Sequence, residues 1–574
     1  MAENNYDVVI CGGGLAGLTL ARQLKLGLPD ITILILDKLT TPLSEVTSKV
    51  GESTVYPGAY YLSDVLQLRE YLKSDQYISK LGLRFFFGNS QGKFQERPEI
   101  GLAEYQPAPH SYQINRGRLE NYLRDLNTST GIEILEGCRV KGINLGDNSG
   151  ASHQVTYTQG LNYATHSCKT HWIIDAMGRR RFLQTKLGLK KANDPRFNAV
   201  WFRIKGHINI DDFVPLTEQN WHSRVPGYKR YLSTNHLCGQ GYWIWMIPLA
   251  SGHTSIGIVS QEKFHPLHQL FNYDKTYKWL ENHEPTLASH LQGKTPEDFM
   301  KMPRYSYSAT QVFSPQRWGC TGEAATFPDP FYSPGIDLIA YSNSLLTKMI
   351  KLERQGKLNP KVVEEANLFY LAFSNSTAEF IQNVNYSCLG KPGVMGMKFI
   401  WDIASFLGSF APTIMNTPYL SWEEHSQVWY RVAMKFPGLG MAMGRLCLDW
   451  ANKSQGRLAY QFIDYGKLSF LQDLRERNLK ANKSVNELLA DLEKNYQVLE
   501  ELAQVIFLLA LEDTMPELLN KFSEPVWLNV QAMSLDPNAW EAEGLFKPTS
   551  QPRDLGYLQR EFDFLKKGDL VGAV

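Results

Sequence analysis

A glycine-rich turn near the start of the chain constrains the fold more than any other feature. Residues 6–10 are mainly apolar and read YDVVI, residues 12–17 read GGGLAG, and residues 31–38 read ITILILDK. An apolar strand that passes through glycines into a helix, and then returns as a second apolar strand, is typical of a βαβ unit. The sequence therefore predicts an α/β fold with a buried parallel sheet.

The same turn indicates a dinucleotide site. Gly12, Gly14 and Gly17 satisfy the pattern G-x-G-x-x-G, with Ala16 inside it, and Asp37 follows at the end of the second strand. The glycines let the backbone approach a pyrophosphate at a helix N-terminus, and a carboxylate at this spacing reaches a ribose hydroxyl. A turn used only for tight packing is the alternative, which the acidic residue disfavours.

Three later segments favour FAD over NAD. WIIDAMGRR, residues 172–180, resembles the Asp-Ala-x-Gly segment of glutathione-reductase-type flavoproteins. INRGRLENYL, residues 114–123, resembles the arginine-containing helix start of those proteins, and WGCTGEAATFPDP, residues 318–330, resembles their second flavin motif. Glutamate replaces the usual aspartate of that motif, and the longer carboxylate still reaches a ribityl hydroxyl. The flavin contacts predicted from these segments are Arg116, Asp175, Gly322 and Glu323.

The chain divides into three regions that differ in their predicted secondary structure. Short strands with polar turns fill residues 131–172, aromatic-rich strands fill residues 199–259, and helical spacing dominates the remainder. We expect a glutathione-reductase-type FAD-binding domain over residues 1–345, with a substrate-side sheet inserted at about 199–310. A mainly helical region, residues 346–574, would cover the substrate pocket.

Charge, cysteine usage and hydropathy disfavour several classes of function. Lys and Arg number 59 and Asp and Glu number 58, a net charge of +1, so we expect no nucleic-acid partner. The seven cysteines form no CxxC pair, which disfavours a metal or dithiol site and favours a reducing compartment. We expect a cytoplasmic protein without a signal peptide or a transmembrane segment, because no uncharged apolar run reaches ~18 residues.

Two segments of the helical region invite a functional interpretation. GLGMAMG, residues 438–444, does not match the spacing of a nucleotide fingerprint and is interpreted as a close helix contact. Residues 395–415 are strongly apolar, with Asp402 inside, and are interpreted as core. A lid over a hydrophobic substrate, or a docking face for a carrier protein, is the alternative for this second segment.

Four segments together resemble the flavin-dependent halogenases. YWIWMIP, residues 242–248, contains their Trp-x-Trp-x-Ile-Pro signature. KVGEST, residues 49–54, lies where a flavin loop would fall, and KLGLRFFF begins at Lys80. DPFYSPGIDL, residues 329–338, follows the second flavin motif. Taken alone, the two tryptophans favour a buried strand end. The resemblance covers about residues 6–345.

The resemblance implies a reaction. Reduced FAD, oxygen and a halide would yield hypohalous acid, which crosses a tunnel to an electron-rich aromatic substrate. Lys80 would direct the oxidant, while Trp243 and Trp245 would wall the tunnel and keep substrate off the flavin, which also excludes water. Ser333 would contact the halide. The other residues that the resemblance places at the flavin or halide are Gly51, Glu52, Ser53, Pro334 and Gly335.

Two positions depart from the family pattern. Tyr332 stands where the tryptophan halogenases carry a glutamate, which favours a phenolic or pyrrolic substrate over free tryptophan. Pro334 stands at one of two backbone N–H donors expected to hold halide, and proline has no N–H. The lost hydrogen bond corresponds to a ~10- to 100-fold loss of halide affinity, unless the backbone shifts or Ser333 replaces the donor through its hydroxyl or its N–H.

The leading hypothesis is a flavin-dependent halogenase of a small phenolic or pyrrolic compound in secondary metabolism, using reduced FAD, oxygen, and chloride or bromide. Presentation of the substrate on a carrier protein and delivery of the flavin by a separate reductase are both left open. The second hypothesis, which Pro334 favours, is a halide-independent FAD oxidase, dehydrogenase or monooxygenase. A non-catalytic flavin-binding scaffold protein is the third.

Overall fold

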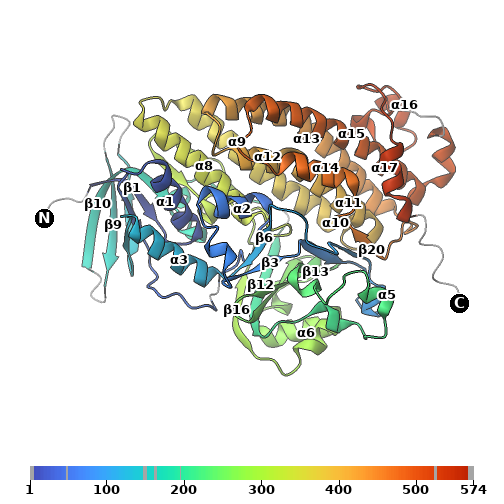
Figure 1. Cartoon of the computed structure of the whole chain (residues 1–574), viewed down its shortest axis with the longest axis horizontal. Helices are drawn as coiled ribbons and strands as arrows, with labels where there is room; N and C mark the ends of the chain where they lie inside the picture. Colours follow the sequence, from blue (N-terminus) through green and yellow to red (C-terminus); the bar gives the residue numbers. More distant parts are fainter. Residues whose placement is uncertain are drawn as a thin grey trace.

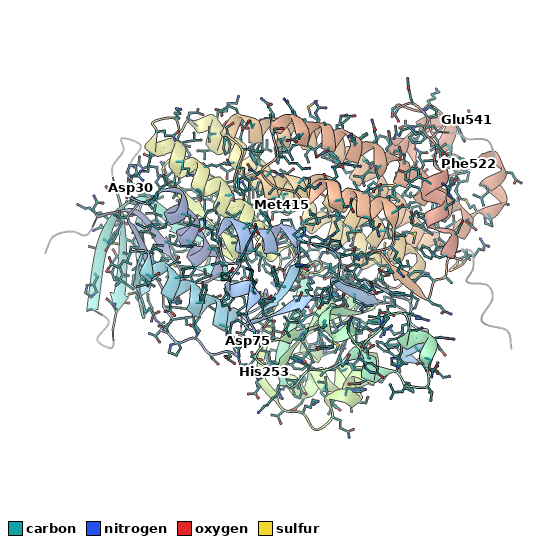
Figure 2. The ribbon with its side chains drawn as sticks, in the orientation of Figure 1. Asp30, Asp75, His253, Met415, Phe522 and Glu541 are labelled. Atoms are coloured by element: carbon teal, nitrogen blue, oxygen red, sulfur yellow. The ribbon has the colours of Figure 1, made fainter. Side chains whose placement is uncertain are left out.

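The computed structural model describes residues 5–46, 49–88, 90–146, 152–160, 164–193, 196–522 and 527–565. Within these ranges, two large sheets lie against a layer of long helices (Figure 1). The first sheet lies at the N-terminal end of the molecule, the second lies beneath the helices, and the C-terminal helices extend away from the first sheet (Figure 1). Side chains fill the space between these layers, and the buried Met415 lies near the centre (Figure 2).

The first sheet carries the glycine turn and confirms the predicted βαβ unit. Its strand order is β18-β19-β10-β1-β2-β7, and β9 and β8 extend it from β10. β1 pairs in parallel with β10 and β2, which places the two strands around the turn at the centre of the sheet. The strands are β1 (Asn5–Cys11), β2 (Ile33–Leu36), β7 (Glu133–Leu135), β8 (Arg139–Asn144), β9 (His153–Gln159), β10 (Ala164–Asp175), β18 (Phe313–Ser314) and β19 (Trp318–Cys320).

The second sheet draws its strands from three parts of the chain. Its order is β16-β12-β15-β14-β13-β4-β5-β20, so the expected insertion at about 199–310 supplies only part of it. β4 and β5 precede the insertion, and β20 comes from within the helical region. The strands are β4 (Leu83–Phe86), β5 (Glu99–Gly101), β12 (Phe197–Lys205), β13 (Thr234–Gly239), β14 (Tyr242–Leu249), β15 (His253–Gln261), β16 (Pro296–Met302) and β20 (Phe462–Asp464).

Long helices follow the second flavin motif, as helical spacing predicts. α13 and α15 each begin with a capping box, built by Ser421 with Glu424 and by Ser484 with Glu487. The π-helical segments η9 (Phe380–Asn385) and η10 (Phe406–Phe410) interrupt the layer. The helices used below are α1 (Leu15–Gly27), α3 (Arg116–Ser129), α8 (Gly335–Arg354), α9 (Pro360–Glu379), α10 (Tyr386–Cys388), α11 (Pro392–Ser405), α12 (Ala411–Asn416), α13 (Trp422–Lys453) and α15 (Val485–Thr514).

One hydrophobic core joins the second sheet to the helical layer. It contains Trp243 and Trp245 of β14 together with Met395 of α11, Leu446 of α13 and Leu502 of α15. The helical region therefore packs on the sheet rather than forming a separate body.

The two segments of the helical region that the sequence singled out both pack against other parts of the protein, and residues of both also line a cavity described below. Within the described residues, the helical stretch Pro392–Asn416 is long and apolar enough to span a membrane, but most of it is buried inside the protein. A side chain on Gly440 would place its Cβ 3.0 Å from Phe380, and one on Gly444 would lie 3.5 Å from Val384. The glycines of 438–444 therefore form the expected close helix contact.

Candidate active site

The glycine turn between β1 and α1 leaves open space at a helix N-terminus. Gly12 has φ +114°, and a Cβ there would overlap the carbonyl oxygen of Ala176. A Cβ on Gly17 would overlap Gly12, so both positions require glycine for packing. A Cβ on Gly14 would meet no atom within 4 Å. This empty position at the start of α1 fits a pyrophosphate.

Asp37 and Ala16 lie beside this turn, as predicted. The buried Asp37 carboxylate accepts a hydrogen bond from Arg124 of α3, whose guanidinium also donates to the backbone oxygen of Gly13. A Cβ on Gly322 would lie 2.7 Å from the Ala16 side chain, so α1 and the second flavin motif touch here. Sequence reasoning missed Arg124, because nothing in the local pattern of α3 distinguishes it from a helix-surface arginine.

Asp175 shapes the turn that follows β10. Its carboxylate accepts hydrogen bonds from the backbone N–H of Met177 (3.0 Å) and of Leu183 (2.8 Å), and it is fully buried. Burial raises the pKa of Asp175 to about 6, against these backbone hydrogen bonds. Its oxygens are therefore committed to the protein backbone, and we assign it a positioning role.

A cavity of about 140 Å³, called here the sheet-side cavity, gathers most of the predicted cofactor residues. Among the residues that the structure describes, the buried Nε of Arg116 has no hydrogen-bond partner, and a Cβ on Gly335 would meet no atom within 4 Å. Burial raises the pKa of Glu323. An orphaned donor and an open glycine fit an isoalloxazine ring. The predicted residues that line the cavity are Gly51, Glu52, Ser53, Arg116, Trp243, Trp245, Gly322, Glu323, Ser333, Pro334 and Gly335.

Ion pairs hold the loop that supplies Gly51, Glu52 and Ser53. Glu52 is buried and pairs with Arg203 of β12 at 2.7 Å, which ties the loop to the second sheet. Arg116 donates to the backbone oxygen of Val50. The Glu52 side chain is therefore an anchor of the loop.

Trp243 and Trp245 lie on one face of β14 and line the sheet-side cavity. Trp243 donates from Nε1 to the Tyr386 hydroxyl at 2.7 Å. Trp245 covers Gly257 of β15, where a Cβ would overlap the indole. The two tryptophans, which were expected to wall a tunnel, therefore form a wall of the sheet-side cavity.

His236 lines the same cavity and was missed by the sequence analysis. It lies opposite Trp245 in the β13–β14 ladder and donates from Nδ1 to the backbone oxygen of Arg84 at 3.0 Å. Burial lowers the pKa of His236 to about 3, so the ring is neutral at physiological pH.

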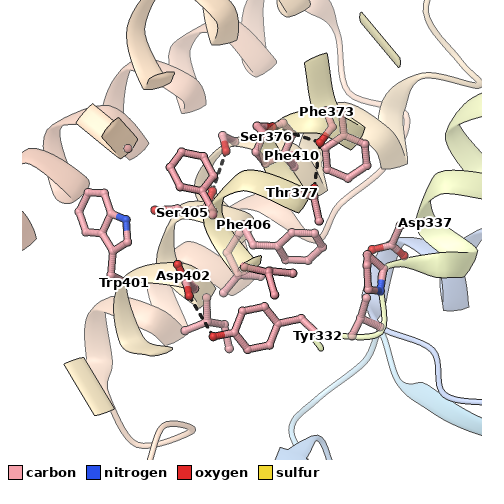
Figure 3. A pocket seen from close by; sticks show the side chains of 18 of the residues that line it. Tyr332, Asp337, Phe373, Ser376, Thr377, Trp401, Asp402, Ser405, Phe406 and Phe410 are labelled. Atoms are coloured by element: carbon pink, nitrogen blue, oxygen red, sulfur yellow. Dashed lines mark hydrogen bonds between the residues drawn. The ribbon is translucent and has the colours of Figure 1, made fainter. Parts of the chain in front are cut away.

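A second cavity of about 340 Å³, called here the helix-side cavity, lies among α9, α11 and α13. Lys80, Tyr332 and Asp337 lie at its polar end; Figure 3 shows Tyr332 and Asp337 there. Pro334 lines both cavities, so the loop of residues 332–335 forms part of the wall between them.

Lys80, the last residue of β3 (Tyr77–Lys80), connects the two cavities. Its Nζ donates to the Ser53 hydroxyl at 2.8 Å and to the Thr54 carbonyl at 2.7 Å. The Ser53 hydroxyl also lies 3.2 Å from that of Ser333. Burial lowers the pKa of Lys80 to about 7, and Asp337 opposes this shift. A buried amine with this pKa is available in neutral and charged forms near pH 7.

Asp337 is the third residue of the site that sequence reasoning missed, after Arg124 and His236. Its Oδ1 accepts from the backbone N–H of Gly58 at 2.7 Å, while its buried Oδ2 has no hydrogen-bond partner in the described part of the chain. Burial raises the pKa of Asp337 to about 8, against the Gly58 hydrogen bond and Lys80. In the sequence this residue is only an acidic position in the first turn of α8, which is a common helix-start feature.

The structure narrows the possible halide donors around Pro334. Ser333 has φ +60°, and its N–H donates to the backbone oxygen of Pro330 at 3.0 Å. Of the two substitutes expected from Ser333, only its hydroxyl can therefore serve. Gly335 is the first residue of α8, so its N–H has no acceptor within the helix.

Tyr332 belongs to a buried polar network at the helix-side cavity. Its hydroxyl donates to Asp402 at 2.9 Å (Figure 3). The same hydroxyl accepts a hydrogen bond from Asn385 at 2.7 Å. Asp402 in turn pairs with Lys398 of the same helix. The network fixes the phenol ring of Tyr332 at the cavity wall.

Comparison with known proteins finds a matching family model and several proteins of similar sequence. The family model for tryptophan halogenase matches residues 86–386. The flavin-dependent halogenase chlA of Dictyostelium discoideum is 27% identical over 450 residues, which cover 73% of this chain and 72% of that protein. A 1H-pyrrole-2-carbonyl peptidyl-carrier-protein chlorinase of Pseudomonas fluorescens is 26% identical, over 59% of this chain and 74% of its own.

The fold is also similar to that of solved halogenases. The halogenase PltM in complex with phloroglucinol and FAD superposes with a TM-score of 0.62 at 17% identity, covering 87% of this chain and 96% of PltM.

Proposed function

The chain belongs to the tryptophan halogenase family, and from that premise we propose a flavin-dependent halogenation of an electron-rich phenolic or pyrrolic compound in secondary metabolism. The pyrrole acted on by one relative and the phloroglucinol bound by PltM support this substrate class. Tyr332 in place of the family's glutamate supports it as well.

FAD is the cofactor, and in its reduced form it supplies the oxygen chemistry that oxidises the halide. The residues around its site hold and enclose it. The N-terminus of α1 at Gly14 would hold the pyrophosphate, and Asp37 and Arg124 would lie at the adenosine side. Arg116 and Glu323 line the cavity for the flavin ring. Trp243 and Trp245 close the cavity against water and a bulky substrate.

The contact between Lys80 and Ser53 carries the proposal. Lys80 faces the helix-side cavity, while the serine it binds faces the sheet-side cavity. An oxidised halogen species released in one cavity therefore meets a lysine amine that opens on the other. The amine can donate a hydrogen bond when charged and act as a nucleophile when neutral.

Asp337 completes the proposed arrangement on the substrate side. Halogenation of an aromatic carbon releases one proton, which a base must accept. The Oδ2 of Asp337 has no hydrogen-bond partner among the described residues, and Asp337 and Lys80 both line the helix-side cavity. A carboxyl whose pKa is about 8 is suited to exchange protons near neutral pH.

A halide-independent FAD oxidoreductase is the second candidate, and the halide side of the site favours it. Pro334 has no N–H, and the Ser333 N–H is committed to Pro330. The remaining donors are the Ser333 hydroxyl and the Gly335 N–H. We infer weak halide binding, which demands a salt-rich medium if halogenation is the reaction.

We further propose that a separate reductase supplies the reduced flavin, and that the protein works in the cytoplasm. Within the part of the chain that the structure describes, the helical region packs on the shared core and adds no second nucleotide-binding sheet. All seven cysteines are buried and free, which suits a reducing compartment. A carrier-bound substrate is compatible with the pyrrole relative.

The decisive experiment needs no natural substrate. The protein is loaded with reduced FAD and mixed rapidly with oxygen, with and without bromide or chloride, while flavin absorbance is followed. A saturable, halide-dependent change in flavin reoxidation, together with halogenation of an added resorcinol, is the expected result. Reoxidation that ignores halide at every concentration would overturn halogenation and leave the halide-independent oxidoreductase.

A further inference from the structure

The helix-side cavity is longer than a single aromatic ring requires. Its lining runs along α9 and η9 from Phe373 to Ile381, about 12 Å at the helical rise per residue. On the opposite side the lining runs along α11 and η10 from Phe399 to Phe410, about 16 Å. Its volume of about 340 Å³ lies within the range of ligand sites.

Three helix irregularities meet at this cavity. The π-helical segments η9 and η10 both contribute residues to the lining, and Pro437 inside α13 is itself a lining residue. A π-helical segment and an internal proline each weaken regular helix hydrogen bonding, and π-segments are frequent at functional sites. Their convergence on one space indicates a built cavity rather than a packing defect.

Away from the end that holds Lys80 and Asp337, the wall is mainly apolar, although the paired Asp402 carboxylate and the Ser405 hydroxyl also line it. Phenylalanines from α9, η9 and η10 surround the space, and Figure 3 shows Phe373, Phe406 and Phe410 along it. The hydroxyls of Ser376 and Thr377 donate to carbonyls of their own helix. The middle of the cavity therefore offers few polar partners to a ligand.

The far end of the cavity reaches the surface. Glu379 and Met441 line it and are both exposed. The space is thus an apolar channel with a titratable pair at its inner end and an opening at its outer end.

We propose that the substrate is a phenol that carries a lipophilic alkyl chain. The ring lies beside Lys80 and Asp337, and the chain lies between α9–η9 and α11–η10, pointing toward Met441. The role of the ring rests on the proposed function, whereas the chain site rests on the channel alone. A phosphopantetheine arm of a carrier protein is disfavoured, because its amides would lie unpaired along the apolar wall.

Binding to the FAD-loaded protein tests the inference without any turnover. Resorcinol, 5-propyl-, 5-pentyl- and 5-heptylresorcinol are titrated calorimetrically, with 1-heptanol as the chain-only probe. We expect about fourfold tighter binding per added methylene until the channel is filled, and weaker binding of heptanol than of heptylresorcinol. Equal affinity of resorcinol and heptylresorcinol, or of heptanol and heptylresorcinol, would overturn the inference.

Ser405→Phe fills the channel without breaking a hydrogen bond, because the Ser405 hydroxyl is buried and unpartnered. We expect at least tenfold weaker binding of heptylresorcinol and unchanged binding of resorcinol. Ser387→Phe, on an exposed helix position outside the channel, is the matched control. If Ser405→Phe does not fold, Phe406→Ala replaces it, and the preferred chain should lengthen; an unchanged preference contradicts the channel site.

The same panel separates the two proposals. Chain-length-dependent binding without halogenation of any resorcinol would leave the channel site standing and defeat the halogenase assignment. Halogenation of resorcinol and heptylresorcinol with equal affinity and rate would support the halogenase assignment and contradict the channel site.

Discussion

Lys80 shows how burial turns an ordinary residue into a reactive one. The amine has only hydroxyl and carbonyl partners, Ser53 and Thr54, and its desolvation lowers its pKa to about 7. Asp337 faces the same cavity, and burial raises the pKa of its carboxyl to about 8. The two opposite shifts leave a lysine and an aspartate that can both change protonation near neutral pH.

Replacement of Lys80 should separate transfer of the halogen from its formation. Lys80→Met keeps the volume and removes the amine. We expect halide-dependent flavin reoxidation to persist while halogenated product falls by about 100-fold or more. Mass spectrometry of the product and flavin absorbance measure the two steps. Lys348→Met is the control, because Lys348 is a half-buried lysine whose pKa burial also lowers but which lines neither cavity. Equal product from both variants would remove Lys80 from the reaction.

Replacement of Pro334 tests the missing donor directly. Pro334→Thr restores a backbone N–H at the start of α8, so the halide concentration for half-maximal reoxidation should fall by about 10- to 100-fold. Pro360→Thr, at the first position of α9, is the control for a proline lost from a helix start. Halide dependence that is the same in Pro334→Thr and in the unaltered protein would place the halide elsewhere.

At the scale of elements, the signature strand depends on its neighbour. Trp243 and Trp245 share a face of β14, and the indole of Trp245 occupies the space above Gly257 in β15. The proline that ends the motif, Pro248, lies near the end of the strand. The motif therefore needs a glycine from another strand, and the sequence of the motif does not specify that glycine.

Gly257→Ala should distort this pair of strands. The added methyl would overlap the indole, and overpacking of a core typically costs about 1–3 kcal/mol of unfolding free energy. Chemical denaturation should show this loss, and FAD affinity should fall because Trp245 lines the sheet-side cavity. Gly142→Ala in β8 is the control, since its Cβ would make only ordinary contacts with Thr156. Wild-type stability and FAD affinity in Gly257→Ala would contradict the packing described here.

At the scale of the whole molecule, three parts of the fold meet at the candidate site: the first sheet, the second sheet and the helical layer. The first sheet carries the turn for the pyrophosphate, the second sheet carries the tryptophans, and the helical layer encloses the helix-side cavity. Figure 1 shows how these two sheets and the helical layer are arranged. The shared hydrophobic core couples the second sheet to the helices. A change in the charge of the buried Lys80–Asp337 region should therefore alter the stability of the fold as a whole.

Asp337→Asn should change how stability depends on pH. The carboxyl pKa is 3.8 in the unfolded chain and about 8 in the folded protein, so this group makes the protein less stable as pH rises between those values. The Asn side chain does not titrate, so the variant does not lose stability in this way as pH rises. Relative to the unaltered protein, its unfolding free energy should rise by on the order of a few kcal/mol from pH 5 to pH 8. Denaturation at both pH values measures it, and Asp464→Asn, a less buried aspartate outside both cavities, is the comparison. A pH-independent difference would mean that Asp337 is already ionised.

The sequence by itself determined the βαβ unit, the FAD site and the residues of the halogenase motifs. These features are local: a glycine turn, strand and helix periodicity, and short motifs whose chemistry depends on residue type and spacing. Only the tertiary structure decided that β4, β5 and β20 join the second sheet, that the tryptophans line one cavity while Lys80 opens on another, and that Asp337 faces this lysine. Such contacts join residues far apart in the chain, and their geometry comes from packing of the core rather than from any local pattern.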